Sequence, residues 1–165
     1  MTMMDHLRQY LDTWVMLRQP RPEGWRFSCI EDLVLQHGTP YEFAACPYEA
    51  FPKACYDRAY DHATRRKSPW IYVEGYAANS KAGLPVPHAW ITRADQPGKA
   101  FELAWGFAGD PEIHTAYLGV PIQAGYVRKC HRKSKGGFYS VFDTWWMDHP
   151  LVTGATPIEE VIWRP

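Results

Sequence analysis

Hydrophobic residues near the start of the chain recur with the spacing of amphipathic helices. A first set falls on one helical face: Leu7, Tyr10, Leu11, Trp14 and Leu17. This set predicts a helix that ends at the segment QPRPEG, residues 19–24. The apolar segment at 27–36 predicts a second helix, with Ser28 as its N-cap and Glu31 completing a capping box.

A third helix is expected over 52–66, after a loop over 39–52 that prolines interrupt. Pro52 suits the first position of a helix, where its missing N–H leaves no bond unmade. Cys55 would then lie in the first turn, where unpaired amide groups and the helix dipole favour a negative charge. A thiol in such a position ionises more readily, and the thiolate is the nucleophilic form.

From residue 70 onward the pattern changes to the period of two that is typical of strands. It predicts strands at 70–78, 88–92 and 100–105, an extended segment at 115–122, and a last hairpin around the basic run 128–135. Because helices precede strands, the expected fold class is α+β, with N-terminal helices packed on a mainly antiparallel sheet.

Composition and charge narrow the classes of function. The chain has 165 residues, which fits a single domain, 1–165. Lys+Arg and Asp+Glu number 18 each, so the formal net charge is +0, which argues against a nucleic-acid-binding or membrane-surface protein. The N-terminal segment has no long apolar run, so we expect neither a signal peptide nor a membrane span, and a cytoplasmic location.

The cysteines favour free thiols over a metal or disulfide framework. Cys29, Cys46, Cys55 and Cys130 form no C-x-x-C pair, and their spacing matches no common zinc pattern. We therefore expect reduced thiols, no metal site and no cofactor. Cys46 is a rival nucleophile to Cys55, but it lies in a predicted loop without a helix start beside it.

A thiolate nucleophile needs an imidazole within hydrogen-bond reach and a third group that orients the imidazole. His88 opens a predicted strand and Glu102 lies on the next one. A two-residue turn centred on Pro97-Gly98 would put these two side chains on opposite faces, and an odd, bulged loop would put them on one face. We favour the odd loop. Taken singly, the three residues also fit a core thiol, a structural histidine and an edge-strand charge.

The order of these residues resembles a known family. The segments C at 55, HAW at 88–90 and ELAW at 102–105 are similar to the transglutaminase-like branch of the papain-like thiol superfamily, and YVEGYA at 72–77 resembles the strand before that family's histidine loop. The resemblance covers 50–122 as a papain/transglutaminase-like core. It leaves a helical N-terminal part at 1–49 and the C-terminal hairpin at 123–165.

The resemblance implies Cys55 as nucleophile, His88 as base and Glu102 as the group that orients His88. It implies hydrolysis or acyl transfer on an amide, isopeptide or thioester, with a protein or a small amide or acyl compound as substrate. Two positions depart from the family pattern. Glu102 stands where the family has Asp, and Ala104 stands where it has Thr; each departure allows a shifted geometry or an inactive site.

Aromatic and basic residues near the predicted site suggest further roles. Trp90, Trp105 and Tyr117 are candidate walls of a substrate cleft. The basic run would form the tip of the last hairpin, through Arg128, Lys129, Arg132, Lys133 and Lys135. We favour a solvated tip that prevents pairing at the sheet edge. The alternative is a site for phosphate-rich ligands or single-stranded nucleic acid, in which Phe138 would take part.

Two other hypotheses stay open beside the enzyme. One is a binding or inhibitor module on the same scaffold, which keeps the cleft without turnover. The other is an unrelated α+β domain in which Cys55, His88 and Glu102 never meet.

Overall fold

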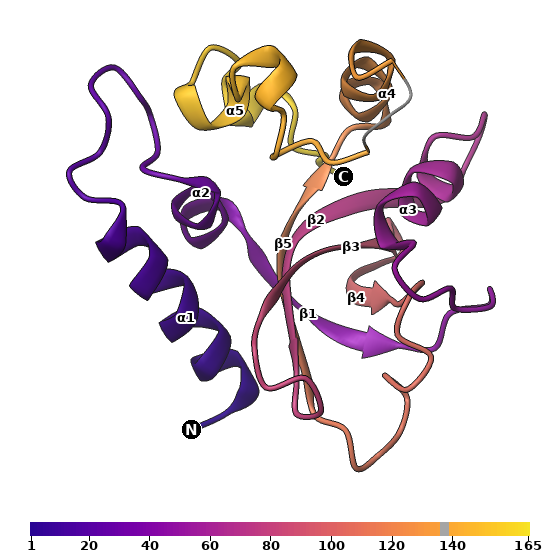
Figure 1. The fold of residues 1–165 in the computed structure, drawn as a ribbon. Coiled ribbons are helices and arrows are strands. Elements are labelled where there is room, and N and C mark those ends of the chain that lie inside the picture. The colour runs from indigo at the N-terminus through magenta and orange to yellow at the C-terminus, as the bar shows by residue number, and fades with distance from the viewer. Residues whose placement is uncertain (136–138) are drawn as a thin grey trace.

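The computed structural model describes residues 1–135 and 139–165, and its centre is a closed barrel of five strands with helices outside it (Figure 1). The barrel order is β1-β4-β3-β2-β5. The strands are β1 (Thr39–Ala44), β2 (Trp70–Asn79), β3 (Val86–Arg93), β4 (Gln96–Phe101) and β5 (Thr115–Ile122). β1 and β4 pair in parallel, and the other four pairings are antiparallel. The α+β class is confirmed, and closure into a barrel is the feature that the sequence did not predict.

The helices cover the outside of this barrel. α1 (Met3–Leu17) and α2 (Ile30–His37) pack on each other and against β5, and α3 (Cys55–Ala63) packs on β2 and β3. α4 (Ala124–Lys133), α5 (Pro150–Thr153) and the short helices η1 (Trp145–Met147) and η2 (Ile158–Glu160) belong to the C-terminal part, which lies at the top of Figure 1. In the described part of the chain, every helix is too short or too polar to cross a membrane.

The first helix forms as its hydrophobic spacing predicts. Leu7 and Leu11 are fully buried, and a capping box begins the helix. The Thr2 hydroxyl accepts the Asp5 N–H at 3.1 Å, and the Asp5 carboxylate accepts the Thr2 N–H at 2.8 Å. Leu17, at the end of the helix, is 69% exposed.

The capping box expected at the second helix is wrong. Cys29 is the N-cap of α2 and makes no side-chain cap bond. The Ser28 N–H donates to Asp32 at 2.8 Å instead. The Glu31 carboxylate makes no bond to the Ser28 N–H; it accepts the Tyr76 hydroxyl from β2 at 2.6 Å and lies beside the Cys29 thiol.

The sequence prediction is wrong in two segments. Residues expected as loop over 39–52 begin with β1, which closes the barrel by pairing with β4 and β5. The expected hairpin over 123–165 is also wrong, because its first arm is helix α4, and residues 139–146 form no strand. Lys and Arg are good helix formers, and the buried members of α4 fall on one helical face: Tyr126, Val127 and Cys130. Phe138 lies outside the described residues.

The turn between β3 and β4 decides the geometry of the site. Arg93 pairs with Gln96, so the turn is Ala94-Asp95 and not Pro97-Gly98. The register then shifts before Ile91 pairs with Phe101. This shift, typical of a β-bulge, gives the result expected of an odd loop, because it brings the position after Phe101 to the face of β3 that carries His88. Glu102 lies just beyond the end of β4, where a continuing strand had been expected.

Aromatic side chains fill the inside of the barrel. The interior cluster comprises Tyr41, Val73, Ala77, Trp90, Ala100 and Tyr117. Gly119 makes room for the indole, since a Cβ there would lie 2.5 Å from the Trp90 ring and 2.9 Å from a backbone oxygen. The opposite faces of the strands pack against the helices and form the larger core.

Candidate active site

Cys55 is the first residue of α3, so the prediction that it lies in the first helical turn is confirmed. Ala54 is the N-cap, and Pro52 precedes the helix instead of opening it. The preceding loop contains Lys53 in the left-handed region, with φ of 64°. The Phe51 N–H donates to the Leu103 carbonyl at 2.8 Å, which ties this loop to the residue that follows Glu102. Cys55 itself is partly exposed and therefore reachable from solvent.

His88 and Glu102 form a buried pair. Nε2 of His88 lies 2.9 Å from Oε2 and 3.1 Å from Oε1 of Glu102. Each residue is only 3% exposed. Because Nε2 is engaged by the carboxylate, Nδ1 is the ring nitrogen left for Cys55.

The Glu102 carboxylate is held from several directions. Oε1 accepts three backbone N–H groups, from Leu103 at 2.9 Å, Ala104 at 2.7 Å and Trp105 at 3.1 Å. Oε2 accepts the Tyr117 hydroxyl at 2.9 Å. The longer side chain of Glu thus folds back over its own turn while still reaching His88, and Ala104 contributes through its backbone without needing a hydroxyl.

The charges of the pair support each other. Burial disfavours a charged His88, but the Glu102 carboxylate and a hydrogen bond with Cys55 outweigh it and raise the pKa of His88 above its ordinary value. Burial likewise works against the Glu102 anion, but His88 and the backbone N–H groups lower the pKa of Glu102 below its ordinary value. The arrangement therefore favours an imidazolium between a carboxylate and a thiol.

The other three cysteines lie in less favourable surroundings for a thiolate. Burial raises the pKa of Cys29 to about 12 and the pKa of Cys130 to about 11. Burial also raises the pKa of Cys46, the rival nucleophile, and the nearby Glu102 charge acts in the same direction. These three thiols are therefore protonated near neutral pH.

The predicted cleft residues take different positions around His88. Trp105 stacks on the imidazole with 4.6 Å between ring centroids and an interplanar angle of 18°, and it is partly exposed. Trp90 and Tyr117 are fully buried in the barrel, so their assignment to an open cleft wall is wrong. Tyr117 instead supports Glu102 through its hydroxyl, a role that strand spacing alone did not reveal because it depends on barrel closure.

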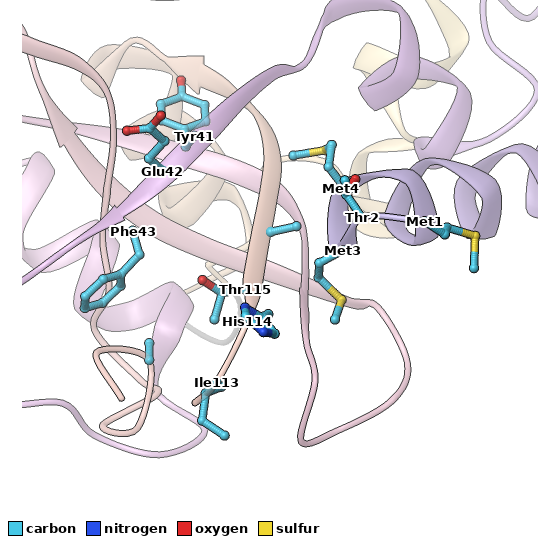
Figure 2. Close-up of a pocket in the computed structure, with 12 residues that line it drawn as sticks. Met1, Thr2, Met3, Met4, Tyr41, Glu42, Phe43, Ile113, His114 and Thr115 are labelled. Atoms are coloured by element: carbon cyan, nitrogen blue, oxygen red, sulfur yellow. The ribbon is translucent and has the colours of Figure 1, made fainter. Parts of the chain in front are cut away.

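Cavities lie both beside this site and away from it. A cavity of about 740 Å³ lies between the start of α1, β1 and the start of β5 (Figure 2). None of Cys55, His88 and Glu102 lines it. A smaller one, of about 270 Å³, is lined by Tyr56 and Pro87. Tyr56 is the chain neighbour of Cys55, so the smaller cavity borders the thiol side of the site, whereas Pro87 lies on the face of β3 opposite His88.

The remaining candidates stand apart from this chemistry. Within residues 1–135 and 139–165, no group of three or more His, Cys, Asp or Glu side chains could hold a metal ion. The basic side chains expected at a hairpin tip lie on or just after α4, and all five are exposed: Arg128, Lys129, Arg132, Lys133 and Lys135. Arg128 donates to the Thr64 carbonyl at 3.1 Å, which joins α4 to the end of α3.

Comparison with known proteins adds no relative. No protein-family model matches the chain, no curated protein matches it, and no solved structure matches it. The assignment of the site accordingly rests on its residues and their geometry.

Proposed function

We propose that the protein is a thiol-dependent hydrolase or acyltransferase that acts on an amide, isopeptide or thioester through Cys55, His88 and Glu102. The observation that carries this proposal is the buried His88–Glu102 pair, with 2.9 Å between Nε2 and Oε2, beside a thiol at a helix start. A thiol, an imidazole and an orienting carboxylate are the three parts that nucleophilic catalysis by cysteine requires.

The reaction follows from these positions. The Cys55 thiolate attacks the carbonyl carbon of the substrate, forming a C–S bond and moving an electron pair to the carbonyl oxygen. N–H groups at the start of α3 are free to stabilise that oxyanion. The intermediate collapses, the bond to the leaving group breaks, and the His88 imidazolium gives the leaving group its proton. This step leaves a thioester on Cys55.

The thioester is then resolved by water or by an amine. His88, now neutral, takes the proton of the incoming nucleophile, whose oxygen or nitrogen attacks the same carbon. The C–S bond breaks and the thiolate–imidazolium pair is restored. Glu102 keeps the ring oriented in both halves, because its carboxylate is fixed by backbone N–H groups and by Tyr117.

We assign the core at 50–122 to the transglutaminase-like branch of the papain-like superfamily as part of this proposal. Its support is the chain order of the three residues, together with a nucleophile helix that packs on the strands β2 and β3. Two features of the fold can be compared with the experimental structure of a family member: the closed barrel, and the single parallel pair among its five strand pairings.

The test is the pH dependence of alkylation by iodoacetamide, followed at each cysteine by peptide mass spectrometry. Cys55 should react faster than Cys29, Cys46 and Cys130, which should react slowly until the pH is well above neutral. His88→Ala should remove this advantage of Cys55. His62→Ala is the matched control, because it removes a buried imidazole from the same helix outside the site.

Acylation by p-nitrophenyl acetate provides a second readout. An acetyl group should appear on Cys55 and turn over in the wild type, and the Cys55→Ala variant should show neither. If Cys55 reacted like an ordinary free thiol with and without His88, the enzyme proposal would be wrong and a silent binding module would be favoured.

A further inference from the structure

The cavity of about 270 Å³ next to the site has apolar walls. They are formed by Ile30 of α2, Tyr56 of α3, Tyr76 and Pro87 of the barrel, and Phe142 of the C-terminal segment. Binding sites for whole ligands begin at roughly 300 Å³. The space therefore suits one side chain of a substrate better than a cofactor.

The floor of this cavity is a buried carboxylate whose bonding is complete. Glu74 is 3% exposed. It accepts the Tyr72 hydroxyl at 2.7 Å, the Val141 N–H at 2.8 Å and the Ser140 hydroxyl. Glu74 therefore anchors the C-terminal segment to β2, and its oxygens are already occupied by protein donors.

Asp143 supplies the free charge of the cavity. It lines the cavity and is exposed, so it lies toward the open side. Its backbone N–H donates to the Ser140 hydroxyl at 2.9 Å, which fixes the residue. Its carboxylate makes no hydrogen bond or ion pair with the described residues, and no Lys, Arg or His among them lines the cavity.

The cavity borders the helix that carries the nucleophile. Tyr56, which follows Cys55, lines it from α3, and Pro87 lines it from the face of β3 opposite His88. The charges of Cys55 and Asp143 both act on the Tyr56 hydroxyl. The thiol and the unpaired carboxylate therefore both lie near this hydroxyl.

We infer that this cavity binds a long side chain that ends in a cation, Lys or Arg, belonging to the acyl donor that Cys55 attacks. The apolar walls would contact the methylene groups of that side chain, and Asp143 would pair with its charge at the open side. Only the statement that this side chain belongs to an acyl donor rests on the proposed function. The cavity and its free carboxylate stand without it.

Binding is measured first, in the Cys55→Ala variant, so that no turnover is needed. Nα-acetyl-arginine amide is titrated by NMR and compared with Nα-acetyl-citrulline amide, which has nearly the same shape without the charge. The arginine compound should bind about tenfold more tightly, the expected effect of one charge-assisted contact. Adding Asp143→Asn should remove that preference.

Asp148→Asn is the matched control. Asp148 lies on the same C-terminal segment, is exposed and does not line the cavity. Its backbone is left-handed, with φ of 55°, a conformation that Asn adopts readily. This variant should keep the preference for arginine, which separates a local contact from a general effect of net charge.

Turnover is measured second, with the methyl esters of Nα-acetyl-arginine and Nα-acetyl-citrulline. The ratio of their kcat/KM values should favour arginine about tenfold, and Asp143→Asn should bring the ratio close to one. If both compounds bound equally to the Cys55→Ala variant, the cavity assignment would be overturned. It would also be overturned if Cys55-dependent turnover showed no preference.

A third outcome separates the two proposals. If the arginine amide bound preferentially through Asp143 while Cys55 was never acylated, the cation-binding cavity would be supported. The proposed enzymatic function would then be the part that failed.

Discussion

The carboxylate of Glu102 and the imidazole of His88 form an ion pair inside the barrel wall, with 2.9 Å between Oε2 and Nε2. The pair joins the start of β3 to the turn that follows β4; β3 packs on α3, and the turn is tied to the loop before α3 by the bond from the Phe51 N–H to the Leu103 carbonyl. Because both side chains are buried, loss of either one leaves the other as a buried charge that water does not reach to hydrogen-bond. The protonation state of the site is therefore set by this contact.

His88 should remain protonated through neutral pH in the wild type and become neutral in Glu102→Gln. The Glu102 charge is the largest influence that raises the pKa of His88, and Cys55 adds to it, so loss of the Glu102 charge lets the opposing effect of burial bring the pKa down. Heteronuclear NMR of the His88 ring against pH measures both titrations. Equal titration midpoints in the two proteins would contradict this account.

The hydroxyl of Tyr117 should support the site specifically. Tyr117→Phe removes a hydrogen bond of 2.9 Å to Glu102, and we expect a loss of about 1 kcal/mol in the free energy of unfolding. Tyr72→Phe is the control, because it removes a hydrogen bond of 2.7 Å to Glu74 on the helix-covered face. Only Tyr117→Phe should also shift the pKa of His88, because it removes a donor from the carboxylate that pairs with the imidazole; a shift of equal size in both variants would show an indirect effect.

The two buried carboxylates should give opposite pH dependences of stability. The pKa of Glu102 is lowered, so its contribution is present above the unfolded value of about 4.3 and is lost as the pH falls through the folded value. Burial raises the pKa of Glu74 despite its hydrogen bonds, so the ionised form costs stability as the pH rises above about 4.3.

Urea unfolding at several pH values between 4 and 7 tests this pair. The stability advantage of the wild type over Glu102→Gln should grow from pH 4 to about 5, where the unfolded Glu102 ionises, and should shrink at higher pH, because His88 is protonated in the folded wild type and neutral in the variant. The advantage over Glu74→Gln should shrink over the same range. Parallel curves for the two variants would rule out the assigned difference between the carboxylates.

Gly119 should tolerate no side chain. Gly119→Ala would place a Cβ 2.5 Å from the Trp90 ring and 2.9 Å from the Glu74 carbonyl oxygen, and overpacking of this kind costs about 1–3 kcal/mol. Gly125→Ala in α4 is the control, because a Cβ there meets nothing within 4 Å. It should be neutral or stabilising by up to about 1 kcal/mol. Thermal unfolding of both variants measures the difference, and comparable midpoints would contradict the tight fit around Trp90.

Local patterns predicted the elements whose stability is mostly local or whose faces are uniformly buried. The first helix follows from its 3.6-residue spacing, and β5 matches the predicted segment 115–122 at both ends. The prediction failed at β1, because its Pro40 reads locally as a loop and its pairing partners are distant in the chain. It failed at α4 because a basic run flanked by aromatic residues does not distinguish a solvated hairpin from a solvated helix.

The sequence by itself determined the α+β class, the place of Cys55 at a helix start, and the chain order of Cys55, His88 and Glu102. Only the tertiary structure decided that these residues meet, that Tyr117 holds Glu102, and that Asp143 lines a cavity beside the thiol. The physical reason is that side-chain periodicity is a local property. Contacts across 14 to 15 residues at Glu102 depend on one register shift between β3 and β4 and on closure of the barrel.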